Sequence, residues 1–204
     1  MEIIIIQFFI LIYAIIFHEV SHGYAAYFLG DRTAKYMGRL TLNPIPHIDL
    51  LGSILLPAVF LLFPTGIIFG WAKPVPINSN NLRNPKRDTL LVAVAGPVAN
   101  ILIALLASII LKSSLFLGLH FNELITMIFV FVIQINLVLA IFNLLPIPPL
   151  DGSHILEYFL SYKAKYYYEQ FAPYGIIAIF LLAYLGILGR LLEIFLLPVL
   201  RFLI

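Results

Sequence analysis

Long apolar stretches dominate the chain, and its polar residues are concentrated in the segments between them. A helix needs about 20 mostly apolar residues to cross a bilayer. Four stretches reach that length, at about 3–29, 89–111, 122–144 and 173–203. The last stretch is long enough for a tilted helix or for a kink near Gly186 and Gly189. A shorter run at about 154–162 predicts one further helix.

The composition agrees with this pattern. Of 204 residues, 62% are hydrophobic and 11% are charged, whereas about 25% of residues are charged in an average soluble domain. A net charge of +2 gives no reason to expect nucleic-acid binding. The absence of cysteine excludes disulfides and thiolate metal sites. We therefore expect an all-α polytopic membrane protein, with residues 1–204 forming a single membrane-embedded domain and the first apolar stretch retained as a span.

The apolar segment 50–71 is harder to interpret, because Pro57, Pro64 and Gly66 interrupt it and disfavour a continuous helix. The flanking loops 31–49 and 72–88 are both rich in lysine and arginine, so both are expected on the cytoplasmic side. A full span would place them on opposite sides. We therefore expect a re-entrant hairpin at 50–71, which gives about five to six membrane helices or hairpins in total.

An HExxH pattern formed by His18, Glu19 and His22 lies inside the first apolar stretch. On a helix this spacing places two imidazoles one turn apart on the same face, beside a carboxylate. Such a set supplies two zinc ligands and a general base. A chance occurrence is the alternative, but ionisable residues at membrane depth are costly and are usually functional.

A catalytic zinc ion usually has three protein ligands, and Asp151 is the best candidate for the third. It follows a proline-rich segment, and an acidic residue in such apolar surroundings needs a cationic partner. The alternative is an acid that caps a helix. Asn143 is a candidate donor to a developing oxyanion, or else forms an interhelical hydrogen bond. His47 and His154 remain further candidates near the metal.

Several motifs resemble the site-2 protease family, the intramembrane metalloproteases of peptidase family M50. They are HExxH at 18–22, N-x-x-P-x-x-x-x-D-G at 143–152, G-P-x-x-N at 96–100, which looks like the start of a helix, and the segments 38–49 and 70–76. The set looks like the compact bacterial branch without PDZ or CBS domains. One departure is visible, because Ser153 and His154 stand where the family often has a second glycine.

The resemblance implies one Zn²⁺ per chain, held by His18, His22 and Asp151, with Glu19 as the general base and Asn143 near the substrate. It implies a zinc endopeptidase that cleaves peptide bonds in or near transmembrane helices. We expect a short extended, β-like loop near the site, contacts with lipids, and a multi-pass location in the inner (cytoplasmic) membrane. The active site should lie in the cytoplasmic half of the bilayer. A non-proteolytic membrane zinc protein, either a scaffold or a transporter, is the alternative. No oligomeric state is predicted.

Overall fold

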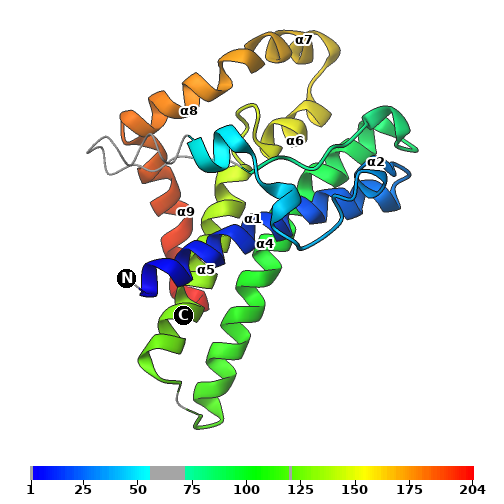
Figure 1. Cartoon of the computed structure of the whole chain (residues 1–204). Helices are drawn as coiled ribbons and strands as arrows, with labels where there is room; N and C mark the ends of the chain where they lie inside the picture. Colours follow the sequence, from blue (N-terminus) through cyan, green and yellow to red (C-terminus); the bar gives the residue numbers. More distant parts are fainter. Residues whose placement is uncertain (1, 56–71, 120) are drawn as a thin grey trace.

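The computed structural model describes residues 2–55, 72–119 and 121–204, and the regular secondary structure in these ranges is entirely helical (Figure 1). This confirms the expected all-α class. The α-helices are α1 (Glu2–Phe28), α2 (Thr33–Tyr36), α4 (Pro85–Phe116), α5 (Glu123–Asn143), α6 (Asp151–Phe159), α7 (Tyr162–Phe171), α8 (Gly175–Tyr184) and α9 (Ile187–Leu203). Short 3-10 turns lie at Ile45–His47, Ser79–Asn81 and Ala172–Tyr174, and a π-helical turn lies at Leu50–Leu55.

Three helices in the described ranges are long and apolar enough to cross a membrane, namely Ile3–Phe28 in α1, Pro85–Ser114 in α4 and Glu123–Asn143, which is α5. They coincide with the first three predicted spans. A fourth span is possible only as the pair Tyr162–Tyr184 and Ile187–Leu203, which is bent by 79°. The bend occurs at Gly186, at one of the two predicted kink positions, where φ is +69°.

Other details of the prediction are not confirmed. The described residues give three or four candidate spans, whereas five to six helices or hairpins were expected. Most of the predicted re-entrant segment, from 56 to 71, lies outside the described residues. The segment 72–78 carries no regular secondary structure, and no described residue lies in a β-strand. The G-P-x-x-N motif does not open a helix, because α4 begins at Pro85 and Pro97 lies within it.

The core is formed where α4, α5 and α9 meet. Ala104 and Ala107 of α4 are buried against Ile133 and Leu137 of α5, and two leucines of α9 complete the cluster. Alanines at this contact allow the helix backbones to approach closely, which is how membrane helices gain packing energy without a hydrophobic driving force from water. In Figure 1, α9 runs back beside α5, so the C-terminal end of the chain lies against the hairpin that α4 and α5 form.

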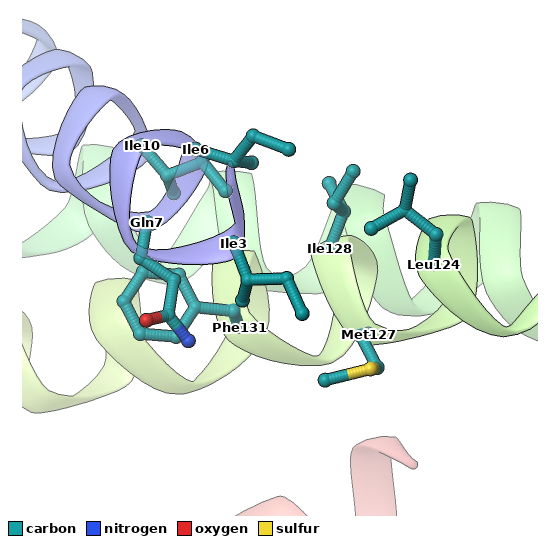
Figure 2. Close-up of a pocket in the computed structure, with 8 residues that line it drawn as sticks. All are labelled: Ile3, Ile6, Gln7, Ile10, Leu124, Met127, Ile128 and Phe131. Atoms are coloured by element: carbon teal, nitrogen blue, oxygen red, sulfur yellow. The ribbon is translucent and has the colours of Figure 1, made fainter. Parts of the chain in front are cut away.

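A cavity of about 30 Å³ lies between the N-terminal half of α1 and the first part of α5. Figure 2 shows that Ile3, Ile6, Gln7 and Ile10 line it from α1, and that the side chains from α5 are Leu124, Met127, Ile128 and Phe131. Gln7 is its single polar lining residue. This cavity is separate from the HExxH motif, which lies further along α1.

The end of α1 is fastened to the segment after residue 77 by the buried carboxylate of Asp31. One oxygen, Oδ1, accepts hydrogen bonds from the backbone N–H of Thr33 and from Asn81 Nδ2, each at 3.0 Å. The other, Oδ2, accepts from the backbone N–H of Asn78 at 2.7 Å. Burial by itself would raise the pKa of Asp31, but the hydrogen bonds outweigh burial and lower the pKa below its ordinary value. The ionised form therefore stabilises this junction.

We expect Asp31→Asn to lower the free energy of unfolding by about 1–3 kcal/mol at pH 7, because buried donors lose their charged acceptor. A lowered pKa in the folded state gives stabilisation that is complete above the unfolded pKa of about 3.9 and is lost as the pH falls through the folded pKa. Thermal unfolding in detergent at pH 7 and at pH 3 checks this. An equal difference between wild type and variant at both values would contradict it.

Candidate metal centre

Three potential metal ligands from distant parts of the sequence converge in the structure. His18 and His22 lie one turn apart on α1, and Asp151 is the first residue of α6. Asp151 Oδ2 is 3.0 Å from His18 Nε2 and 3.3 Å from His22 Nε2. The two Nε2 atoms are 3.1 Å apart. Among the described residues this is the one group of three or more such side chains within reach of a single ion.

The protons on the two imidazoles can be placed from their other partners. His22 Nδ1 lies 2.7 Å from the backbone carbonyl oxygen of Val92. A carbonyl only accepts, so this Nδ1 carries the hydrogen. His18 Nδ1 lies 2.6 Å from Asn100 Oδ1, which likewise accepts. In the neutral form, each Nε2 therefore presents a lone pair toward Asp151.

This arrangement suits a cation. Two Nε2 lone pairs and a carboxylate oxygen lie within 3.3 Å of one another, and Asp151 Oδ2 is buried without a hydrogen-bond partner. Zinc–ligand bonds of about 2.0–2.1 Å in tetrahedral geometry separate neighbouring ligands by roughly 3.3 Å, close to the observed spacing. Two imidazoles and one carboxylate form a donor set typical of catalytic zinc, with a coordination position left for water. The residues present therefore fit a zinc ion.

Asp151 reaches this position because α6 begins directly against the end of α5. A Cβ atom at Gly152 would overlap the backbone carbonyl groups of Leu144 and Leu145, so only glycine allows the two helix ends to pack this closely. The side chain of Asp151 faces the two histidines.

Glu19 lies beside the three side chains and faces a larger cavity. Its Oε2 accepts a hydrogen bond of 2.8 Å from the backbone N–H of Val75. The segment that carries Val75 is held by the buried Arg39, whose Nη2 donates to the carbonyl oxygens of Lys73 and Pro74 at 2.7 and 3.2 Å. The residues after the undescribed segment thus return to the HExxH helix and fix one oxygen of Glu19.

The cavity has a volume of about 490 Å³ and is mainly apolar. His18, Glu19 and Asn143 are among its lining residues, together with side chains of α5, α8 and the 149–150 turn. Asn143 Nδ2 donates to the carbonyl oxygen of Leu139 in its own helix at 3.0 Å, and the side chain still contributes to the cavity wall. Reactive groups and an apolar space therefore lie side by side.

Comparison with known proteins agrees with this geometry. Residues 113–186 match the model of "Peptidase family M50". A Bacillus subtilis (strain 168) protein named "Putative zinc metalloprotease YwhC" is 40% identical over 183 residues, which cover 88% of this chain and 80% of that protein. The chain belongs to peptidase family M50. It is a metalloprotease that uses Zn²⁺, and as a peptidase it acts on protein substrates. Its apolar helices indicate a membrane protein.

More distant relatives carry the same kind of name. A Mycobacterium tuberculosis (strain H37Rv) protein named "Putative zinc metalloprotease Rip2" is 29% identical over 80% of this chain and 62% of its own length. A Mycolicibacterium smegmatis protein of that name is 29% identical over 69% of this chain and 51% of its own length. No solved structure matches. The resemblance to the site-2 protease family is confirmed, and the peptidase relationship favours an enzyme over a scaffold or a transporter.

The other two histidine candidates, His47 and His154, lie apart from the three converging side chains. His47 is buried, but its Nε2 pairs with the carbonyl oxygen of Thr41 at 2.9 Å. His154 is half exposed and faces Glu157 at 3.8 Å. Neither belongs to the candidate metal group.

Sequence reasoning missed three polar contacts of the site. Asn100, predicted only as part of a motif at the start of a helix, contacts His18. Val75 was assigned no role and Arg39 was used only as a charge of a basic loop, yet both residues order the segment against Glu19. The only signal in the sequence was that Asn100 and Arg39 lie within motif segments. Their position in a motif does not reveal which groups they contact.

Gly96 explains why α4 can lie directly against the metal-site imidazoles. A Cβ atom there would overlap the rings of His18 and His22. We expect Gly96→Ala to displace these rings and to weaken zinc binding at least about tenfold, the lower range for disturbing the surroundings of metal ligands. Competition with a chelator in detergent measures this. Gly189→Ala is the control, because nothing lies within 4 Å of a Cβ there. Equal zinc affinity in both variants would contradict the prediction.

Proposed function

We propose that this M50 protease is an intramembrane zinc endopeptidase that hydrolyses peptide bonds in or near transmembrane segments of membrane proteins. His18, His22 and Asp151 are the zinc ligands, with one Zn²⁺ per chain. The observation that carries the proposal is the convergence of two imidazole lone pairs and a buried carboxylate oxygen within 3.3 Å. It lies beside an apolar cavity.

The chemistry divides among the residues that line the cavity. Zinc, when bound, polarises a water molecule and lowers its pKa towards about 7. Glu19 accepts the proton of that water and later delivers it to the leaving amine. The N–H of Val75 holds the carboxylate in place for this transfer. Asn143, in the cavity wall, donates a hydrogen bond to the developing oxyanion.

The lining of the cavity supports a substrate drawn from the membrane. Ile15, Leu139, Phe142, Ile179 and Phe180 surround the three polar side chains. Such walls favour apolar side chains of a substrate. A helical substrate must unwind locally, because helical amides are shielded by their own hydrogen bonds. We therefore propose that the protein takes a transmembrane helix whose end can open beside Glu19.

The basic loops support a location in the inner membrane with the site on the cytoplasmic side. Arg32, Lys35 and Arg39 follow α1, and Lys86 and Arg87 lie at the start of α4. Positively charged loops remain in the cytoplasm. His18 and His22 lie in the C-terminal half of α1, the half nearer to the first of these loops, so the site lies in the cytoplasmic half of the bilayer. Lipids then surround the exposed apolar faces of α1, α4 and α5.

The purified protein in detergent tests this proposal with a panel of synthetic transmembrane-helix peptides and soluble peptides of similar length. Mass spectrometry maps each cut. We expect cleavage within the apolar segments, loss of cleavage after a zinc chelator, and recovery when zinc is restored. Cleavage restricted to the soluble peptides would contradict the intramembrane assignment while leaving the metalloprotease in place.

A further inference from the structure

The buried amides of Asn100 and Asn136 form a hydrogen-bonded chain that ends on His18. Asn100 lies on α4 and Asn136 on α5, with exposed fractions of 0% and 1%. Asn100 Nδ2 donates to Asn136 Oδ1 at 2.8 Å. Asn100 Oδ1 lies 2.6 Å from His18 Nδ1. Three helices are therefore linked through two amides to one imidazole of the proposed metal site.

Backbone carbonyl groups fix the orientation of both amides. Asn100 Nδ2 also donates to the carbonyl oxygen of Ala14 at 3.2 Å. Asn136 Nδ2 donates to the carbonyl oxygen of Val132 at 2.9 Å. Carbonyl oxygens only accept, so flipping either amide would place oxygen against oxygen. The chain of hydrogen bonds therefore has one direction, and it presents an acceptor to His18.

This direction decides which nitrogen of His18 carries the proton. With Nδ1–H donating to Asn100, the lone pair lies on Nε2, which faces Asp151. His22 reaches the same state through the carbonyl oxygen of Val92, a backbone group that mutation does not remove. Only His18 depends on side chains for its tautomer. An unsatisfied polar group in a membrane bundle costs free energy, so this complete network strongly favours a single arrangement.

We propose that Asn100 and Asn136 are positioning residues for the metal site. Asn100 fixes the tautomer and ring plane of His18, and Asn136 fixes the amide of Asn100. The inference rests on the proposed role of His18 as a zinc ligand. Partners that accept the second N–H of a metal-binding histidine typically contribute about 10–100-fold to metal affinity. Asn136 would then influence the site without touching a ligand.

The experiment measures zinc dissociation constants by chelator competition in detergent, for wild type and three variants. Asn100→Leu removes the acceptor at similar volume and should raise the zinc Kd about 10–100-fold. Asn100→Asp keeps an oxygen for His18 Nδ1–H but loses the donor toward Ala14 and Asn136, so it should recover only part of the affinity. Asn136→Leu should fall between wild type and Asn100→Leu. It also serves as the second variant if Asn100→Leu fails to fold.

A matched control separates positioning from general destabilisation. Ser108 is a buried polar residue of α4 whose hydroxyl donates to the carbonyl oxygen of Leu203. Ser108→Ala removes a buried hydrogen bond away from the imidazoles, so it should lower thermal stability and leave the zinc Kd unchanged. A second readout is the ¹⁵N NMR signal of His18 in metal-free protein. We expect the Nδ1–H tautomer in wild type and a mixture of tautomers in Asn100→Leu.

The outcomes distinguish this inference from the proposed function. Wild-type zinc affinity and an unchanged His18 tautomer in both leucine variants would overturn the positioning role alone, provided that His18→Ala still loses zinc. If His18→Ala binds zinc normally, the ligand assignment itself fails. A zinc Kd raised equally by Ser108→Ala would also overturn the inference.

Discussion

Glu19→Gln should keep zinc bound at one ion per chain while kcat for a transmembrane-helix peptide falls by about 10²–10⁴-fold, the usual contribution of a general base. The substitution preserves shape and still offers an oxygen to the N–H of Val75. It removes the group that accepts a proton at neutral pH. Glu19 lies in the cavity wall beside His18, so the proton acceptor is lost where the water would react.

Zinc content by elemental analysis and peptide cleavage must be measured on the same Glu19→Gln sample. Glu169→Gln is the matched control, because Glu169 is exposed on α7 and pairs only with Lys165 among the described side chains. The control should behave like wild type in both measurements. Full cleavage by Glu19→Gln would remove Glu19 from the proposed mechanism, and loss of zinc would show that its role is structural.

His22→Ala should bind zinc far more weakly and lose cleavage with it. Removing a group that only supports a ligand costs about 10–100-fold in metal affinity, and loss of a ligand should cost more than this. The remaining His18 and Asp151 would leave two positions open to water. Zinc stoichiometry after dialysis against a weak chelator gives the result directly.

His154→Ala is the matched control for this variant, since His154 is half exposed and lies outside the group of potential ligands. It should retain one zinc ion per chain and full cleavage. If His22→Ala kept stoichiometric zinc, the ligands would have to be assigned elsewhere. If both variants lost zinc, the metal would depend on the fold of the region more than on His22.

The spacing of residues accounts for most of the candidate site. HExxH places two imidazoles on one helix face from local geometry alone, and the structure has His18 and His22 in that arrangement. Asp151 was predicted from its polarity in an apolar, proline-rich setting, and it lies within 3.3 Å of both histidines. The ligand and base roles remain predictions.

Other features depended on contacts between distant residues. Asn100 is 82 positions from His18, and Val75 is 56 positions from Glu19. Neither pair shares a helix face or a periodic pattern that would reveal it. The start of α4 at Pro85 also differed from prediction, since the polar residues 85–88 continue the helix beyond its apolar part. Hydropathy identifies the apolar part of a helix, and it does not show how far the helix extends into a polar region.

The sequence by itself determined the membrane class and the three long apolar helices and predicted the residues of the candidate site, because apolar runs, the spacing of HExxH and the polarity of Asp151 in an apolar setting are all local features. Only the tertiary structure decided which groups surround the imidazoles. Val92, Gly96 and Asn100 come to the site from α4, and Val75 comes from the segment that precedes it. Their effects depend on hydrogen bonds and close approach between helices, which exist only after α1, α4 and α5 have packed.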